Sequence, residues 1–308
     1  MSQPILLKDK TPDVDPNKIG ISYSGGGPRV LIEIGIARAF VKKGIIPQVI
    51  SGASAGALAG TAHALDVRNG TGLDLAAKLL ERLSNAFVGL EPVEVVERAI
   101  VYRDHTKSLG DNGPIGPLVR DGIQDQFGLR DVTLGTFEAP TYPKLMIVAT
   151  DLLTGNSVWF ADDTPIEQAV VATSAIPGVF PWLPLRLNGI QTVLVDGGVV
   201  SNQPLSNLAL EGCGTIYACA VGGDDAPVEP TNALDNAMRS VHKMMHQCTK
   251  LEEDYVRLKL GDRGTVHHIH PEVDFPVQGF NFTPDLIRQV MDDACAKTLA
   301  WLDEAHPD

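Results

Sequence analysis

The residue best suited to nucleophilic chemistry is Ser54, which lies in the pattern Gly52-Ala53-Ser54-Ala55-Gly56. In a G-x-S-x-G pattern the serine sits on a strained turn between a strand and a helix, and the turn presents its hydroxyl. Glycines and alanines suit such a turn because backbones must approach closely there. Ser54 is therefore a candidate nucleophile. A simpler interpretation makes Ser54 an ordinary N-cap of the helix that follows.

A second candidate for chemistry is the turn Gly25-Gly26-Gly27-Pro28-Arg29. Glycines before a helix can direct several N–H groups toward one anion, so the turn could cradle a phosphate or form an oxyanion hole. Phosphate is disfavoured, because the turn matches neither the P-loop pattern nor G-x-G-x-x-G. Pro28 has no N–H, so the oxyanion donors would be the N–H groups of Gly25, Gly26, Gly27 and Arg29. For the Arg29 side chain we favour a clamp on loop carbonyls over a surface position or a substrate anchor.

Asp196 is the acidic residue that best fits Ser54 as a partner. It follows an expected strand at residues 192–195 and precedes Gly197-Gly198, which would let another backbone approach. A serine hydroxyl needs a base within hydrogen-bond reach before it becomes a good nucleophile. The alternative is a turn aspartate that closes a loop.

Histidines offer a competing arrangement. His267, His268 and His270 follow the aspartate, so the order Ser, acid, His of an α/β-hydrolase triad is formally satisfied. They lie in an expected strand, however, where successive side chains point to opposite faces. We expect each of them, and also His63 and His105, to be structural.

Alternating strands and helices must position these groups. Strands are expected at residues 18–24, 47–50, 144–151, 156–160, 192–195, 215–221 and 265–271. Helices are expected at residues 30–41, 55–65, 71–87, 92–102, 115–127, 165–174, 202–211, 232–260 and 283–302. This alternation predicts an α/β fold with a mainly parallel central sheet.

Two stretches allow several interpretations. Residues 103–117 are rich in glycine and proline and could form a lid or a surface loop. Residues 181–185 read Pro-Trp-Leu-Pro-Leu, which is unusually apolar for a loop. They could line an acyl-chain site, rest on a membrane surface, dock a protein or be buried in the core.

Length and composition bound the architecture. The chain has 308 residues, 44% of them hydrophobic, which suffices for a large core. We find no internal repeat and no linker, so we expect a single domain over residues 1–308. Within it, residues 1–18 are a polar lead-in, residues 19–221 carry the motifs, and residues 231–304 supply C-terminal helices and a strand.

Charge and cysteine content limit the partners and the compartment. The net charge of −13 argues against binding to nucleic acid or to anionic surfaces. Four cysteines, Cys213, Cys219, Cys248 and Cys295, lack the spacing of metal ligands or of a disulfide framework, so we expect reduced thiols. The first twenty residues resemble neither a signal peptide nor a membrane span, which predicts a cytoplasmic protein.

The three motifs occur in an order and at separations that resemble the patatin-like phospholipase family. Residues 172–181 also resemble the stretch that this family carries shortly before its catalytic aspartate. The resemblance covers roughly residues 19–221. It implies a three-layer α/β/α fold and a lipid acyl hydrolase that uses no metal or organic cofactor.

Taken residue by residue, the resemblance implies Ser54 as nucleophile, Asp196 as base in a Ser-Asp dyad, and residues 25–29 as the oxyanion loop. Val30 departs from the family, which usually has glycine there, and we expect altered packing but not lost catalysis. The substrate would be a phospholipid, a lysophospholipid or another acyl ester, reached with at most transient membrane contact. A non-catalytic acyl-lipid binding protein is the alternative from another class, because function lies in the site and not in the fold.

Overall fold

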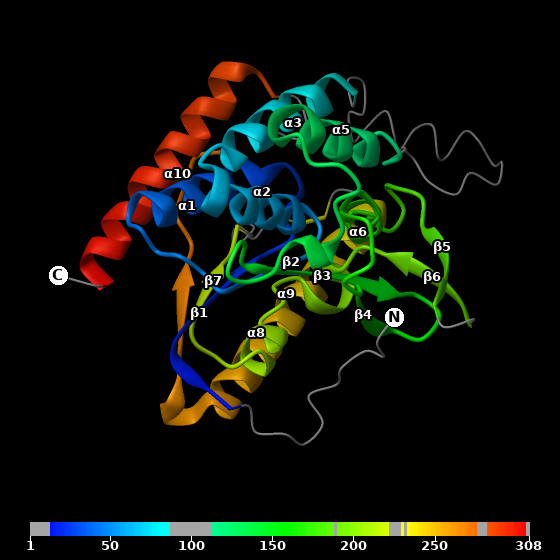
Figure 1. Cartoon of the computed structure of the whole chain (residues 1–308). Coiled ribbons are helices and arrows are strands. Elements are labelled where there is room, and N and C mark those ends of the chain that lie inside the picture. The colour runs from blue at the N-terminus through cyan, green and yellow to red at the C-terminus, as the bar shows by residue number, and fades with distance from the viewer. Residues whose placement is uncertain are drawn as a thin grey trace.

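The computed structural model of the chain describes residues 13–86, 112–187, 190–221, 229–230, 233–275 and 282–305 (Figure 1). Within these residues eight strands form one central sheet. They are β1 (Asp15–Tyr23), β2 (Val49–Gly52), β3 (Lys144–Asp151), β4 (Asn156–Trp159), β5 (Leu183–Leu187), β6 (Ile190–Val195), β7 (Cys213–Cys219) and β8 (Thr265–Ile269).

The sheet is mixed but mostly parallel. Its strand order is β5-β6-β3-β2-β1-β7-β8, and β4 pairs with β3 outside this path. The pairs among β3, β2, β1, β7 and β8 are parallel, so the carboxyl ends of these strands share one edge. Strands β4 and β6 run antiparallel to β3, and β5 runs antiparallel to β6. Strand β6 therefore brings its own carboxyl end to the middle of the sheet, beside β3.

Helices cover both faces of the sheet (Figure 1). On one face lie α1 (Val30–Lys42), α2 (Ala55–Asn69), α3 (Gly72–Ala86), α5 (Ile115–Phe127) and α10 (Pro284–Ala305). On the other lie α8 (Ser206–Leu210) and α9 (Ala233–Leu260). The short helices α6 (Ile166–Thr173) and α7 (Gly198–Ser201) follow β4 and β6 in the chain.

Two of the three apolar clusters in the described residues join the helices to the faces of the sheet. The larger one packs α1, α2 and α10 against the sheet through fully buried residues such as Ile21, Ile34 and Ile50. The smaller one packs α8 and α9 on the opposite face through Leu208 and Val256. The expected α/β sandwich is therefore present, because each face of the sheet is apolar and each is covered by helices.

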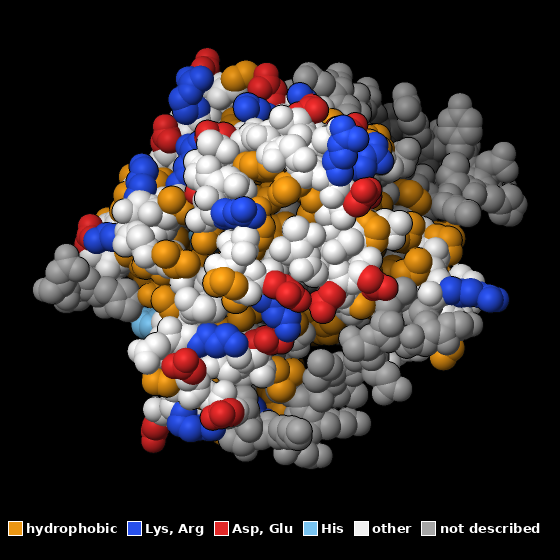
Figure 2. All heavy atoms as spheres, viewed as in Figure 1, with side chains coloured by type: hydrophobic (Ala, Val, Ile, Leu, Met, Phe, Trp, Pro, Cys, Tyr) orange, Lys and Arg blue, Asp and Glu red, His pale blue; other side chains and the backbone are white. Residues whose placement is uncertain are grey.

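On the face seen in Figure 2, acidic and basic side chains are intermixed. Lys and Arg side chains alternate there with Asp and Glu side chains. Of the part of the chain that the structure describes, no helix is both long and apolar enough to cross a membrane.

Most expected elements are confirmed at nearly the expected positions, but the helix expected at residues 202–211 is confirmed only in its second half, as α8. Residues 202–211 do not form a continuous helix, since α7 ends at Ser201 and α8 begins at Ser206. Pro204 lies between the two helices, and its carbonyl accepts hydrogen bonds from the hydroxyls of Ser22, at 3.2 Å, and Ser51, at 2.5 Å. These contacts with β1 and β2 hold the segment in a non-helical conformation.

Strand β5 was not expected, because prolines flank and interrupt its sequence. It lies at the edge of the sheet, where a proline is tolerated because no partner strand needs its N–H. Leu183 and Leu185 are half-buried against the apolar residues of β3 and β6, whereas Trp182 and Pro184 are exposed. The expected helix at residues 92–102 and most of the stretch 103–117 lie outside the described residues.

Candidate active site

Ser54 lies at the turn from β2 into α2 in a strained backbone conformation. Its φ of 51° and ψ of −124° belong to a region that residues other than glycine rarely adopt. Ser54 occupies the N-cap position of α2, yet its side chain makes no capping hydrogen bond. Its hydroxyl donates instead to Oδ2 of Asp196 at 2.5 Å. The turn therefore directs the hydroxyl toward a carboxylate, and the simple N-cap interpretation does not describe it.

Close backbone packing explains the small residues around this turn. A Cβ atom added to Gly56 would lie 2.3 Å from the carbonyl oxygen of Tyr23, at the end of β1. A Cβ atom added to Gly52 would lie 2.5 Å from the carbonyl oxygen of Gly56. Both approaches are shorter than any van der Waals contact, so only glycine fits at these positions.

The backbone N–H of Ser54 is held by a side chain that sequence reasoning had not singled out. It donates to Oγ1 of Thr173, at the end of α6, at 2.8 Å. The same hydroxyl donates to the carbonyl oxygen of Val148 in β3 at 2.5 Å. Thr173 lies within the stretch 172–181 that resembles the patatin-like family, which was the only sequence signal for it.

Asp196 follows β6 directly and is 4% exposed. Burial raises the pKa of this carboxyl to about 6, although hydrogen bonds from the Ser54 hydroxyl and the Gly198 N–H act in the opposite direction. The Gly198 N–H donates to Oδ1 at 2.7 Å, which leaves Oδ2 for Ser54. With a pKa near 6 the group is mostly ionised at neutral pH, yet it can accept a proton readily.

The glycine turn precedes α1, and part of it borders the same site. The N–H of Gly25 donates to the carbonyl oxygen of Asn202 at 2.8 Å, and the N–H of Arg29 donates to that of Gly26 at 3.1 Å. These two expected oxyanion donors are thus engaged within the protein. Among the described residues, the N–H groups of Gly26 and Gly27 have no protein acceptor. Gly27, with φ of +54°, also lines the pocket beside Ser54.

Side chains beneath the turn fix its position. The Arg29 guanidinium donates to the carbonyl oxygen of Val221 at 3.4 Å, so the expected clamp is present. The Ser24 hydroxyl accepts from the N–H of Val221 at 3.2 Å and donates to Glu33 at 3.4 Å. Burial holds the pKa of the Glu33 carboxyl well above its ordinary value. Asn202 binds Gly25 a second time, through a side-chain donor to the Gly25 carbonyl oxygen at 3.2 Å.

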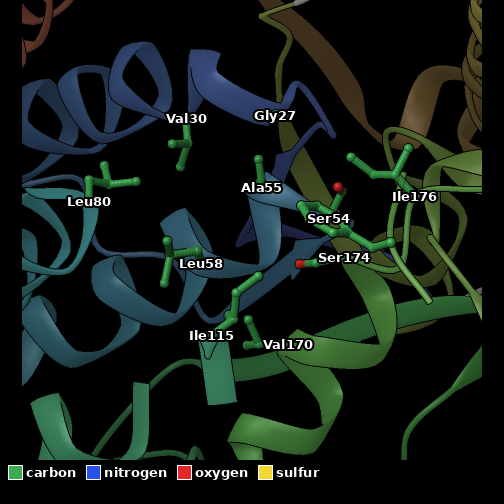
Figure 3. Close-up of a pocket in the computed structure, with 11 residues that line it drawn as sticks. Gly27, Val30, Ser54, Ala55, Leu58, Leu80, Ile115, Val170, Ser174 and Ile176 are labelled. Carbon is green, nitrogen blue, oxygen red and sulfur yellow. The ribbon is translucent and has the colours of Figure 1, made fainter. Parts of the chain in front are cut away.

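An apolar pocket of about 50 Å³ opens beside Ser54. Figure 3 shows Val30, Leu58, Ile115 and Val170 around one space next to Ser54. Val30, the residue that departs from the resembled family, is thus part of the wall. The lining residues come from the glycine turn, α1, α2, α3, α5, α6 and the segment after α6, and they are Gly27, Val30, Ser54, Ala55, Leu58, Leu80, Ile115, Val170, Ser174, Ile176 and Phe180. None of residues 181–185 is among them.

The histidines lie elsewhere. Among the described residues, the Asp196 carboxylate is bonded by the Ser54 hydroxyl and the Gly198 N–H and not by a candidate histidine, and His105 falls outside those residues. Each of the other four candidate histidines has a different neighbour: His63 bonds the Tyr23 hydroxyl, His267 stacks on Tyr217, His268 bonds Glu253, and His270 bonds the Ala220 carbonyl oxygen.

The cysteines are free thiols, and Cys213, Cys219 and Cys295 are buried. In the residues described, no three His, Cys, Asp or Glu side chains converge on a point that could hold a metal ion.

Comparison with known proteins adds sequence relatives. An uncharacterized NTE family protein of Mycobacterium tuberculosis is 26% identical over 212 residues, which are 68% of this chain and 50% of that protein. Lysophospholipase NTE1 of Saccharomyces cerevisiae is 26% identical over 219 residues, 70% of this chain and 12% of that protein. Among solved structures, VipD from Legionella pneumophila has 16% identity and a TM-score of 0.41, covering 95% of this chain and 67% of that one.

The family model for patatin-like phospholipases matches residues 21–209. This range holds the glycine turn, Ser54 and Asp196, and it runs from β1 into α8. The match spans half the length of that M. tuberculosis relative. Since the model covers more than half of the 308 residues, and the mostly parallel sheet flanked by helices is the patatin fold, the chain belongs to the patatin-like phospholipase family.

Proposed function

We propose that this chain is a lipid acyl hydrolase that cleaves carboxylic esters of phospholipids, lysophospholipids or other acyl lipids. Ser54 acts as the nucleophile and Asp196 as its base. The observation that carries this proposal is the 2.5 Å hydrogen bond from the Ser54 hydroxyl to a buried carboxylate at a strained turn. Membership in the patatin-like phospholipase family supports it, as does the similarity to a protein named lysophospholipase.

In the first half of the reaction the Ser54 oxygen attacks the ester carbonyl carbon, and its proton moves to Asp196 Oδ2. The negative charge that develops on the carbonyl oxygen is stabilised by the free N–H groups of Gly26 and Gly27. The carbonyl then re-forms, the bond to the alcohol breaks, and Asp196 returns the proton to the departing alkoxide. An acyl-enzyme on Ser54 and a free alcohol or lysolipid result.

In the second half, water replaces the alcohol. Asp196 accepts a proton from this water as its oxygen attacks the acyl carbon, and the same N–H groups stabilise the new oxyanion. Collapse of this intermediate releases the fatty acid, and Ser54 regains its proton from Asp196. One ester bond and one water are consumed, and the dyad is restored.

The apolar pocket suits the acyl side of the substrate. Its walls are formed mainly by aliphatic side chains and Phe180, while its polar side chains are those of Ser54 and Ser174. Pockets of this kind bind the apolar part of a ligand and leave orientation to a few polar groups. The acyl chain would therefore lie among Val30, Leu58 and Val170, and the head group would point away from them.

The test is hydrolysis of a short-chain chromogenic acyl ester and of a lysophospholipid. Wild type is compared with Ser54→Ala and Asp196→Asn, and each protein is checked for folding by circular dichroism. Both variants are expected to lose at least about 10³-fold in kcat, because neither retains an activated nucleophile.

The His267/His268/His270 triple alanine variant is the matched control, since it removes the histidines whose position after Asp196 in the sequence fits a triad. It is expected to keep its activity. A folded triple variant without activity would favour a Ser-Asp-His triad over the dyad. A folded wild type that binds acyl ligands but hydrolyses none of them would identify a non-catalytic binding protein.

A further inference from the structure

Thr173 binds Ser54 and the residue next to Asp196 through separate atoms. Its Oγ1 accepts the backbone N–H of Ser54 at 2.8 Å, and its carbonyl oxygen accepts the N–H of Gly197, next to Asp196, at 3.3 Å. From this geometry we infer that Thr173 is a positioning residue, which sets the separation between the Ser54 hydroxyl and the Asp196 carboxylate. The inference rests on the proposed function.

On the nucleophile side, Thr173 supplies a hydrogen-bond acceptor for the backbone N–H of Ser54 at the strained turn. The first N–H groups of a helix have no partner within the helix, and Ser54 sits at that position of α2. A residue held at φ of 51° keeps this conformation only where its surroundings enforce it. The Thr173 hydroxyl anchors the Ser54 backbone, so it fixes the direction in which the Ser54 side chain leaves the turn.

On the base side, the segment around Thr173 also anchors Asp196. The N–H of Asp196 donates to the carbonyl oxygen of Ala175 at 2.9 Å, two residues beyond Thr173. Together with the bond from Gly197, this attaches the carboxyl end of β6 to the end of α6. A single short segment therefore holds the two catalytic groups, which come from distant parts of the sequence.

The hydroxyl of Thr173 both accepts and donates a hydrogen bond. The side chain has no exposed surface, and its own proton is donated to the carbonyl oxygen of Val148 in β3 at 2.5 Å. The hydroxyl thus accepts from the turn and donates to the sheet, which ties the nucleophile to β3. Valine has nearly the same shape as threonine but can neither accept nor donate a hydrogen bond. Comparison of wild type with Thr173→Val therefore isolates the effect of the hydroxyl.

The experiment compares wild type, Thr173→Val, Thr173→Ser and Thr298→Val in steady-state hydrolysis of a soluble chromogenic ester across pH. Thr298 is the matched control, because it is equally buried and donates to Ala294 within α10, away from the dyad. Thr173→Val is expected to lower kcat about 10- to 100-fold, since displacing a reacting group by 1 Å can cost about 100-fold. Thr173→Ser should keep most of the activity, and Thr298→Val should leave kcat unchanged.

The pH profile separates positioning from a general loss of structure. The hydrogen bond from Ser54 lowers the pKa of Asp196, so weakening that bond should move the acid limb of the Thr173→Val profile to higher pH. No such movement is expected for Thr298→Val or Thr173→Ser. If Thr173→Val does not fold, Thr173→Ala replaces it in the same comparison.

Three results would overturn the inference in the presence of an active wild type. The first is a folded Thr173→Val or Thr173→Ala protein with wild-type kcat. The second is a Thr173→Ser protein as inactive as Thr173→Val, because the hydroxyl that serine retains would then not preserve the positioning. The third is a loss of kcat without movement of the acid limb. An inactive wild type would instead contradict the proposed function itself.

Discussion

At the scale of residues, the site depends on a carboxylate whose surroundings disfavour its charge. Asp196 is almost completely buried, and burial is the largest influence on its pKa. Two hydrogen bonds, from Ser54 and Gly198, favour the ionised form but do not outweigh burial. The result is a base with a pKa much closer to neutrality than that of an exposed aspartate, which suits proton transfer at neutral pH.

This pKa predicts the pH dependence of hydrolysis. Asp196 acts as a base only when ionised, so kcat/KM should fall as the pH drops through about 6, the pKa of this carboxyl. Below the midpoint the decline should approach about tenfold per pH unit, as for a single essential proton. The measurement is kcat/KM of wild type on an uncharged ester at constant ionic strength. A midpoint near 4, the ordinary value for aspartate, would contradict the assignment.

The same burial predicts that Asp196→Asn is more stable than wild type at alkaline pH. The pKa is about 6 in the folded protein and 3.8 ordinarily, so ionisation above pH 6 destabilises the fold by up to about 3 kcal/mol. Below pH 3.8 the group is protonated in both states and this cost vanishes. Urea unfolding should therefore show the advantage of Asp196→Asn growing by about 2 kcal/mol between pH 4.5 and 8. A difference that does not change with pH would argue against a buried, ionised Asp196.

At the scale of elements, the sequence predicts a structural feature when the cause of that feature lies in neighbouring residues. The turn at Ser54 is predictable because its pattern of small residues has a local steric cause. The non-helical conformation of residues 202–205 is not predictable from the sequence. It depends on the hydroxyls of Ser22 and Ser51, which donate to the Pro204 carbonyl oxygen from strands that are distant in the sequence. Strand β5 is missed for a related reason: Pro184 is acceptable only because β5 is an edge strand, which is a property of the assembled sheet.

The same limit applies to the oxyanion loop. The sequence identifies four N–H groups that could serve as donors, but it does not reveal which of them are used elsewhere. The engagement of Gly25 by Asn202 comes from a residue far along the chain. Only the folded geometry narrows the proposed donors to Gly26 and Gly27.

Two glycines of α2 give a matched test of the turn. A methyl group at Gly56 would meet the carbonyl oxygens of Tyr23 and Ser24 at 2.3 and 2.5 Å, directly before the glycine turn. At Gly60 it would meet the side chain of Ile50 at 3.0 Å. Gly56→Ala should therefore destabilise the protein by about 1–3 kcal/mol or more and abolish hydrolysis.

Gly60→Ala should keep hydrolysis and change stability by less than about 1 kcal/mol, because better helix propensity offsets the tight contact. Thermal unfolding and ester hydrolysis of both variants provide the measurement. Wild-type activity in Gly56→Ala would show that the turn is less constrained than its packing indicates.

At the scale of the whole molecule, the sequence predicts the layers but not their order. Continuous apolar runs such as Lys144–Asp151 indicate strands buried on both faces, and helices between them require an α/β sandwich. The order β5-β6-β3-β2-β1-β7-β8 depends on which strands pair across long separations, and local patterns do not encode this. That order nevertheless creates the site, because it places the carboxyl end of β6 beside β3, which is itself the neighbour of β2.

The final helix lies outside the range of the family model, yet it belongs to the main core. Helix α10 packs on α1, where Gly35 lets it approach so closely that a Cβ atom would lie 2.6 Å from the Met291 carbonyl oxygen. Its residues Ile287, Val290, Met291 and Leu302 are buried. Burial of four such side chains contributes about 6–12 kcal/mol, which is comparable to the total stability of a typical domain.

Removal of residues 282–308 should therefore abolish cooperative folding, although every proposed catalytic residue is retained. The exposed face of α1 should make the shortened chain aggregate, and urea unfolding should lack a sharp transition. Arg288→Ala in the full-length chain is the control: its side chain is 68% exposed and should change stability by less than about 0.5 kcal/mol. A shortened chain that stays monomeric, unfolds cooperatively and hydrolyses esters would show instead that neither the fold nor the site needs α10.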